Sequence, residues 1–411
     1  MTKLKDKLIV ALSAAGSVLL VGAAPGFSDA TYELVIIEPW NTSYSLATSG
    51  VAGLNNLNQV TGCATTEPLG GPCMFLWTYE HGKAPINLAG PINDLGVIVS
   101  TDTIRWPDGT LQQLDGAMHG AADLNNANVV VGADGSLHTC EYPPYFPDRE
   151  ATVWTESGGT VLVQQQLGVP AADQAWAIND NNEFVGVRSS TGMCGDQKAF
   201  YFNLVTGEHI DLHFELVGGT SGITHAVDIN DAGMVIGDGP GYIGGGAFLW
   251  SAAAGFAFFP DLPGTLPGYS IPSSINNAGT VVGQAIVNEE WRAWIWDEQS
   301  GIRDLNELAQ GVPADFVVEQ AIAINDNGWI IARGHYGTWS PERAVVLIPI
   351  SMPVPGDLDG DGDVDLTDLS LLLAAFGSCS GDPNYNADAD LDGSGCVELV
   401  DLSTLLANFG A

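Results

Sequence analysis

Positively charged residues are scarce in this sequence. Lysine and arginine together number 12, against 49 aspartate and glutamate residues, and the formal net charge is −37 at pH 7. A surface of this sign repels phosphate groups, which argues strongly against nucleic acid or an anionic membrane as the binding partner. The same balance suits solubility outside the cell and the binding of cations.

Long apolar runs are also missing, with one exception at the N-terminus. Three lysines among the first seven residues precede "LIVALSAAGSVLLVGAA", and small residues follow near Ala23 and Ala30. This order predicts a secretory signal peptide over residues 1–30. A membrane anchor is the alternative, but the run is marginal for a span and rich in Ala and Gly. We expect a secreted or cell-surface protein with no membrane span after signal cleavage.

Cysteine is limited to six residues, and no Cys-x-x-Cys motif occurs. No histidine is spaced with these cysteines as zinc ligands would be, so a zinc site is not favoured. Six cysteines in an exported chain indicate three disulfides, although the sequence alone leaves their connectivity open. Local pairing would give Cys63–Cys73, Cys140–Cys194 and Cys379–Cys396.

A catalytic motif is likewise absent from the sequence. His209 and His213 lie in "EHIDLHF", which reads as a strand, and a structural role is favoured over a metal pair. The many acids leave room for a glycoside hydrolase pair. Those in the repeated phrase described next, such as Asp228, Asp231 and Asp326, are interpreted as turn-stabilising residues. The sequence therefore leaves enzyme activity open and identifies no catalytic residue and no organic cofactor.

One phrase recurs seven times, at intervals of 32 to 54 residues; "DINDAGMVIG" and "AINDNGWIIA" are two copies. An apolar residue and Asn precede Asn/Asp-x-Gly/Asn, and three mostly β-prone residues follow. This pattern predicts a β-hairpin in which Gly or Asn supplies the positive φ of the turn. The aligned asparagines are Asn55, Asn93, Asn125, Asn179, Asn230, Asn276 and Asn325.

A second phrase follows each hairpin and mostly ends in an aromatic residue, as in "CMFLW", "AFYF" and "AFLW". A turn and a short segment such as "IRDL" come next in most copies. Four short strands in a unit of about 45 residues match the size of a propeller blade. We interpret the repeated aromatic residue as core packing rather than as a sugar-binding platform.

The two ends of the repeat array indicate how it closes. The last unit stops after "AVVLIPI" without a fourth strand, and "TYELVIIEP" from residue 31 belongs to no unit. Lending that N-terminal strand to the last unit would close a ring and remove its exposed edges. The sequence therefore predicts a mainly β protein with a seven-bladed β-propeller over residues 31–350. An open β-solenoid or a pair of sheets is the alternative, because two units are short for a blade.

These repeats resemble the extracellular HAF repeats, whose members carry A-INd-G-vvG followed by a-lW. The resemblance covers about residues 31–350. The His-Ala-Phe that names the family is here mostly Lys/Arg/Gly-Ala-aromatic, as in "KAF", "GAF" and "RAW". The resemblance implies an extracellular β-repeat fold and no firm catalytic activity.

Aspartates alternate with other residues in "GDLDGDGDVDLTDLSLLLAAFG", residues 356–377. Their spacing is that of a twelve-residue calcium loop, in which Gly362 permits the sharp bend and Val364 anchors the loop to the core. Calcium prefers six to eight hard oxygen ligands, and the carboxylate at position 12 lies on the first turn of the next helix. The predicted ligands are Asp357, Asp359, Asp361, Asp363 through its carbonyl, Asp365 and Asp368.

The same pattern returns 33 residues later, so two calcium ions are predicted. An amphipathic helix follows each loop, and we expect the apolar stripes 366, 369, 373, 376 and 399, 402, 406, 409 to pack on each other. Residues 356–411 contain no Lys or Arg, so folding should depend on calcium or on the Cys379–Cys396 bond. The predicted ligands of the second loop are Asp390, Asp392, Ser394, Cys396 through its carbonyl, Glu398 and Asp401.

Two loop–helix units without the entering helices of a full EF-hand resemble a type I dockerin. The resemblance covers residues 356–411, after a linker at 351–355, and Asp at position 12 also matches that family. It implies docking onto a cohesin module of a scaffold protein. Positions 10 and 11, which help recognise the cohesin in the family, are Leu366/Thr367 and Leu399/Val400, and neither is the familiar Ser-Thr pair.

The sequence leaves three functions open. The favoured one is a secreted, non-catalytic propeller that binds a ligand such as a polysaccharide, or a partner, and is attached by a calcium-dependent dockerin to a cell-surface or extracellular complex. The second is a polysaccharide hydrolase or lyase, for which two carboxylates about 5–10 Å apart in a central pocket would be the sign. The third is a structural component of the extracellular matrix.

Overall fold

The fold is described from a computed structural model of the chain. It describes residues 31–40, 48–65, 73–115, 118–134, 150–169, 172–189, 197–219, 222–239, 246–337, 340–350, 356, 358, 364–391 and 394–409. The predicted signal peptide, the linker at 351–355 and the predicted Cys140–Cys194 bond lie outside these residues. Within them, no helix is long and apolar enough to cross a membrane.

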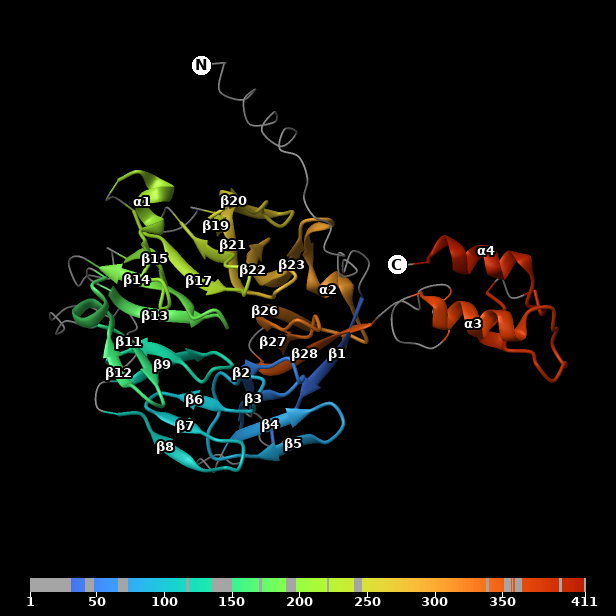
Figure 1. The fold of residues 1–411 in the computed structure, drawn as a ribbon, viewed down its shortest axis with the longest axis horizontal. Helices are drawn as coiled ribbons and strands as arrows, with labels where there is room; N and C mark the ends of the chain where they lie inside the picture. The colour runs from blue at the N-terminus through green and yellow to red at the C-terminus, as the bar shows by residue number, and fades with distance from the viewer. Residues whose placement is uncertain are drawn as a thin grey trace, which may run out of the picture.

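Seven mainly antiparallel β-sheets are arranged around one axis and form a seven-bladed β-propeller (Figure 1), as the repeats predict. Blade 1 contains β2 (Ser49–Leu54), β3 (Val60–Ala64), β4 (Met74–Thr78) and β5 (Gly82–Pro85). Blade 2 contains β6 (Ile98–Ser100), β7 (Thr103–Arg105) and β8 (Leu111–Gln113). Blade 3 contains β9 (Gly120–Leu124), β10 (Val130–Ala133), β11 (Ala151–Thr155) and β12 (Gly159–Leu162). Blade 4 contains β13 (Ala172–Ile178), β14 (Glu183–Ser189), β15 (Gln197–Asn203) and β16 (His209–Ile210). Blade 5 contains β17 (His225–Ile229), β18 (Val235–Asp238), β19 (Ala247–Ser251) and β20 (Gly255–Phe258). Blade 6 contains β21 (Thr265–Ile275), β22 (Val281–Val287), β23 (Glu290–Asp297) and β24 (Gly301–Asp304). Blade 7 contains β26 (Phe316–Ile324), β27 (Ile330–Tyr336), β28 (Arg343–Ile350) and β1 (Thr31–Ile37), with β25 (Ala309–Gln310) beside β1.

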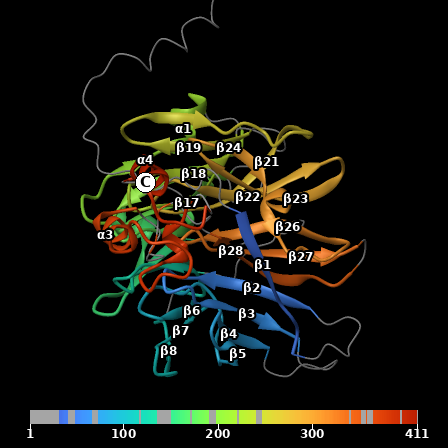
Figure 2. The same cartoon turned by 90° about the vertical axis from the view of Figure 1, so that its right-hand side faces the viewer.

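The ring closes through the N-terminal strand, as predicted. β1 pairs antiparallel with β28 over seven residue pairs, from Thr31 opposite Ile350 to Ile37 opposite Ala344, and it also pairs in parallel with β25. Figure 2 shows β1 beside β28, where the first described strand of the chain completes the last blade. Tyr32 of β1 is fully buried in the core of this blade. The alternative of an open solenoid or two sheets is therefore wrong.

The repeated phrase forms the predicted hairpin in every blade but the second. The turn residue has positive φ, for example 60° at Asn182 and 70° at Gly233. The glycine that usually ends the phrase lies opposite a bulge of the inner strand. A Cβ at Gly186 or Gly237 would come within about 2.0 Å of a backbone oxygen of that strand, so a side chain is excluded there.

Blade 2 differs from the predicted four strands. Its innermost segment pairs only through a single bridge between Ile92 and Ile98, which leaves three strands. Pro91 has no amide hydrogen to donate to a ladder. A Cβ at the preceding Gly90 would come within 2.0 Å of the Val99 carbonyl oxygen, so the segment approaches its neighbour closely without extended pairing.

The aromatic residues that end the third strands are core residues, as predicted. The exposed fraction is 7% or less for four of them, Trp77, Trp154, Phe202 and Trp250. Trp106 and Trp296 are partly buried against neighbouring core clusters. They are therefore not surface platforms for a sugar.

Short helical segments interrupt the propeller. They are the π-helical turn η1 (Val163–Leu167) and the helices α1 (Leu212–Val217) and α2 (Leu305–Leu308). The reading of "EHIDLHF" as one strand is wrong after His209 and Ile210. Asp211 accepts the Phe214 amide and starts α1, which buries His213 completely.

The C-terminal domain contains the helices α3 (Leu366–Ala375) and α4 (Leu399–Ala407) and the 3₁₀ turn η2 (Ala387–Ala389). Its core is Val364, Leu372, Ala375, Ala389, Val397 and Leu405. The predicted stripes are therefore mostly wrong. Leu369 and Leu402 pack on the core, but the exposed fraction is 42% to 72% for Leu366, Leu373, Phe376, Leu399, Leu406 and Phe409.

Two of the predicted disulfides are present, Cys63–Cys73 in blade 1 and Cys379–Cys396 in the C-terminal domain. The first joins the chain on either side of the β3–β4 connection. The second joins the end of the α3 region to the second acidic loop.

Candidate functional site

The second acidic loop is built around Asp390, its first predicted ligand. Asp390 Oδ2 accepts hydrogen bonds from the Tyr385 hydroxyl at 2.7 Å and from the Gly395 amide at 2.8 Å. The bond to Asp390 raises the pKa of Tyr385. The Ser394 hydroxyl donates to the Cys396 carbonyl oxygen at 3.2 Å. The predicted ligands at positions 1, 5 and 7 therefore belong to one hydrogen-bonded loop.

The two position-12 carboxylates, Asp368 and Asp401, are completely buried. Asp368 accepts the amides of Leu358 and Asp365, each at 2.7 Å, and Asp401 accepts the Glu398 amide at 2.7 Å. The bonds from the Asp365 and Glu398 amides belong to the capping boxes that start α3 and α4. Each helix therefore begins inside an acidic loop and turns its position-12 carboxylate inward.

The donors of this domain fit calcium. No Lys, Arg or His occurs in residues 356–411, so no basic side chain of the domain can neutralise the buried carboxylates. Burying ionised carboxylates without a counter-charge is strongly unfavourable. A hard divalent cation bound by carboxylate, hydroxyl and carbonyl oxygens removes that penalty.

Several predicted ligands are not placed by the structure. Asp357, Asp359, Asp361, Asp363 and Asp392 lie outside the described residues, whereas Asp365, Asp368, Asp390, Ser394, Cys396, Glu398 and Asp401 lie within them. In the described part of the chain, no three His, Cys, Asp or Glu side chains are arranged to hold a metal ion.

The propeller axis carries a closed ring of asparagine side chains that the sequence did not reveal. Each of the seven aligned asparagines donates Nδ2 to the backbone oxygen of its equivalent in the next blade, at 2.8 to 3.1 Å, and Asn325 donates to Asn55. Its Oδ1 accepts the amide four residues on, within its own turn. All seven are buried, so the ring is a continuous set of buried hydrogen bonds that joins all seven blades.

The residues that follow these asparagines form a second ring. Each backbone amide donates to the Oδ1 of the next blade's residue at 2.7 or 2.8 Å. Side-chain amides add further bonds. For example, Asn126 Nδ2 donates to the carboxylates of both Asp94 and Asp180 and so bridges them. Two carboxylates follow each other directly at one joint, between Asp180 and Asp231. The order round the ring is Asn56, Asp94, Asn126, Asp180, Asp231, Asn277 and Asp326.

The predicted role of the acids in this phrase is therefore too narrow. The side chains of Asp231 and Asp326 bond to the neighbouring blades, whereas the turn amides are accepted by the aligned asparagine, as at Asn230. Asp228 Oδ2 likewise accepts the Ile275 amide of the next blade at 2.9 Å. The recurrence of Asn/Asp after every aligned asparagine was the available signal for contacts between units.

The rings surround a cavity of about 380 Å³ on the axis. Six carboxylates and no Lys, Arg or His are among its lining residues; the acids are Asp94, Asp123, Asp180, Asp228, Asp231 and Asp326. Burial raises the pKa of Asp123 to about 7 and that of Asp228 to about 6. Asp123 Oδ2 accepts the Ile178 amide of the next blade at 3.0 Å. The cavity is therefore acidic, and two of its carboxyl groups titrate near neutral pH.

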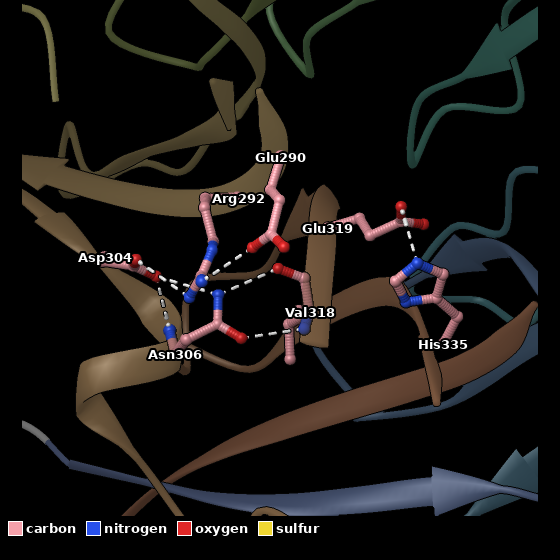
Figure 3. Close-up of polar contacts among 7 residues, drawn as sticks. All are labelled: Glu290, Arg292, Asp304, Asn306, Val318, Glu319 and His335. Carbon is pink, nitrogen blue, oxygen red and sulfur yellow. Dashed lines mark hydrogen bonds and ion pairs between the residues drawn. The ribbon is translucent and has the colours of Figure 1, made fainter. Parts of the chain in front are cut away.

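A further polar network joins blades 6 and 7 (Figure 3). Arg292 lies 3.1 Å from a Glu290 oxygen and 3.8 Å from an Asp304 oxygen. The Asn306 side chain donates to the Val318 carbonyl oxygen at 2.9 Å and accepts the Val318 amide at 2.8 Å. Asn306 thus bonds β26 as a neighbouring strand would, and we interpret the network as a structural fastening.

A histidine–glutamate pair lies beside this network. His335 Nε2 of β27 is 3.5 Å from Glu319 Oε1 of β26, and both side chains are about three-quarters buried (Figure 3). Glu319 lies at a bulge of β26, between Val318 and Gln320. The pair joins two adjacent strands of one blade, and no pattern in the sequence indicated it.

Comparison with known proteins identifies the C-terminal domain. The family model "Dockerin type I domain" matches residues 355–409. No curated protein matches the chain.

Solved structures similar to this chain include three enzymes. They are virginiamycin B lyase from Staphylococcus aureus (9% identity, 78% of this chain and 100% of that chain, TM-score 0.47), oligogalacturonate lyase from Vibrio parahaemolyticus (10%, 77% and 97%, 0.46) and a fungal alcohol oxidase in complex with copper (10%, 82% and 82%, 0.44). Likeness at this level carries no argument about activity. From the match to the family model, residues 355–409 form a type I dockerin domain, and the same chain also contains a seven-bladed β-propeller.

Proposed function

We propose that this is a secreted, calcium-binding protein whose propeller is a non-catalytic binding module, attached through its dockerin to a cell-surface or extracellular complex. The observation that carries the proposal is the dockerin match together with two fully buried position-12 carboxylates, Asp368 and Asp401, in a domain without a basic side chain. The proposed organisation is a signal peptide at 1–30, HAF-like repeats at 31–350, a linker at 351–355 and the dockerin at 356–411.

Two calcium ions are proposed, one in each loop. The first would be held by Asp357, Asp359, Asp361, Asp363, Asp365 and Asp368, and the second by Asp390, Asp392, Ser394, Cys396, Glu398 and Asp401. Bound calcium supplies the positive charge that the domain lacks. The chain's own contribution is to begin each helix at a capping box, so that position 12 faces the loop.

The proposed partner is a cohesin-like module of a scaffold protein, because type I dockerins bind cohesin modules. Leu366 and Leu399, at position 10 of the two loops, are each 72% exposed, and Val400 is 47% exposed. Apolar side chains surrounded by acids favour a partner face with an apolar centre and a basic rim. The two recognition pairs differ, so the two copies offer different surfaces to a partner.

The test combines a calcium titration with capture of the partner. The full chain is titrated with Ca²⁺, and extracellular proteins of the source are captured on it with and without chelator. We expect about two ions per chain and a chelator-sensitive scaffold protein among the captured partners. Asp357→Ala with Asp390→Ala should abolish both results, whereas Asp388→Ala, an exposed acid outside the predicted ligands, should leave them unchanged. Absence of calcium heat in the unaltered chain would refute the proposal.

A polysaccharide hydrolase or lyase acting in the axial cavity is the second candidate. The raised pKa values of Asp123 and Asp228 favour it, because a carboxyl group that titrates near neutral pH can serve as an acid or a base. Release of reducing ends or unsaturated sugars from polysaccharides, lost in Asp123→Asn or Asp228→Asn, would support catalysis. Binding of a polysaccharide without product release, unchanged in both variants, would support the non-catalytic module.

A further inference from the structure

The second calcium loop carries a covalent fastening that the first loop lacks. Cys396, at position 7 of the second loop, is bonded to Cys379, and their Cα atoms are 3.9 Å apart. Position 7 of the first loop is Asp363, and that loop contains no cysteine. Because position 7 contributes its backbone carbonyl to calcium, the disulfide is attached to a residue that supplies a ligand.

The backbone around this disulfide fixes the direction of that carbonyl. The Ser380 amide donates to Gly395 O at 2.8 Å, and the Val397 amide donates to Ser378 O at 2.9 Å. Cys396 lies between these two bonded residues and opposite Cys379. In an antiparallel pair, the residue between two bonded neighbours points its own C=O away from the partner strand. The Cys396 carbonyl therefore points into the loop, where the Ser394 hydroxyl lies 3.2 Å away.

Tyr385 performs the corresponding task for position 1. Its hydroxyl donates to Asp390 Oδ2 at 2.7 Å, and Gly395 donates to the same oxygen from within the loop. The residue 33 positions before Tyr385 is Met352, which has no hydroxyl to donate. The two loops therefore share a ligand pattern in sequence, but the first has neither a cysteine at position 7 nor a hydroxyl at the position that corresponds to Tyr385.

We propose that the Cys379–Cys396 disulfide and Tyr385 position the ligands of the second calcium site, and that reduction of the disulfide selectively weakens calcium binding there. The inference rests on the calcium binding proposed above. Ligands fixed before the ion arrives lose less freedom on binding, which increases affinity. Groups behind the ligands of a metal site typically contribute about 10- to 100-fold to affinity. The second site is thus sensitive to redox conditions, and the first is not.

The experiment separates the two sites within the full chain. Asp357→Ala/Asp359→Ala leaves the second site, and Asp390→Ala/Asp392→Ala leaves the first. Calcium Kd is measured by calorimetry at fixed ionic strength, with and without Cys379→Ala/Cys396→Ala. We expect this pair to raise the Kd of the second site about tenfold and to change that of the first less than about twofold. The matched control, Cys63→Ala/Cys73→Ala, removes a disulfide of the propeller and should change neither.

Tyr385→Phe tests the positioning of the second site independently, because this variant retains the disulfide. If the cysteine variant fails to fold, the result for Tyr385→Phe alone tests the inference. We expect a rise of about threefold to tenfold in the Kd of the second site only. Equal losses at both sites would indicate a general effect on folding and overturn the inference, as would an unchanged second site. If neither single-site chain nor the unaltered chain binds calcium, the proposed function itself fails.

Discussion

At the scale of single residues, asparagine at the head of each hairpin serves two blades at once. Its Oδ1 holds its own turn and its Nδ2 bonds the next blade, as in Asn230, which accepts the Met234 amide and donates to Asn276 O. Aspartate has no hydrogen to donate, so it could supply only the first contact. The sequence indicated the turn because that contact is local. The second contact joins residues 32 to 54 positions apart, and 270 apart where the ring closes, so no local pattern contains it.

Replacing one member of this ring should be costly. Asn230→Ala removes a bond to Asn276 O and leaves the Ala232 and Met234 amides without their acceptor. We expect a loss of about 2–4 kcal/mol in the free energy of unfolding, measured by urea denaturation. Asn181→Ala is the control, since Asn181 is exposed and makes one bond to the next blade. Equal effects of the two changes would contradict the importance of the buried ring.

The partly buried acids Asp123 and Asp228 of the cavity should make stability depend on pH. The pKa of Asp123 is raised to about 7 and that of Asp228 to about 6, so the folded state keeps protons that the unfolded chain has lost. Stability should therefore fall as pH rises from about 4 to about 7. Asp123→Asn, whose amide oxygen can still accept the Ile178 amide, should flatten this fall and raise the urea midpoint at pH 8. The same change at the exposed turn residue Glu298, to Gln, is the control.

At the scale of elements, the two dockerin helices show where apolar periodicity fails. The pattern predicted the helices themselves, but it chose the wrong face. Each helix starts within its acidic loop, and the position-12 acids, Asp368 and Asp401, face inward. The next inward positions are then Leu372 and Leu405, one turn later. The loop therefore decides the orientation of the helix, which hydrophobic spacing alone cannot do.

Two adjacent leucines provide a direct test of this orientation. Leu372 is fully buried, whereas Leu373, a member of the predicted stripe, is 53% exposed. Leu372→Ala should destabilise the dockerin by about 2–5 kcal/mol, and Leu373→Ala by less than about 1 kcal/mol. Scanning calorimetry of the full chain in calcium would compare the two variants. A larger loss from Leu373→Ala would restore the predicted stripe.

At the scale of the whole molecule, the sequence predicted the number of blades and how the ring closes. Seven copies of the phrase and the unpaired N-terminal strand were sufficient, because each copy has its own turn chemistry. The reduced second blade was not foreseen because its phrase keeps the aligned Asn93. Pro91 in the same phrase, which has no amide hydrogen for a ladder, was the available signal. The fastening between blades 6 and 7 through Asn306 was also missed, because it has no counterpart in the repeat.

Removing the closing strand tests the ring as a unit. A chain that begins at Glu38 lacks β1, so it loses buried Tyr32 and exposes the edge of β28. An exposed edge strand pairs readily with other chains. We expect a lower midpoint of thermal unfolding and higher-order species by size-exclusion chromatography, compared with a chain that begins at Thr31. Monomeric elution with an unchanged midpoint would show that β1 is dispensable.

Seven is an odd number, and this has a consequence for the second ring, whose members are Asn and Asp residues. Two kinds of residue can alternate without a fault only around an even circle. An odd circle must place two of a kind together, and here that fault is Asp180 beside Asp231. At the other six joints of the ring an asparagine side chain also donates to a carboxylate, whereas an aspartate pair has no side-chain amide to donate. The propeller should therefore part first between its fourth and fifth blades.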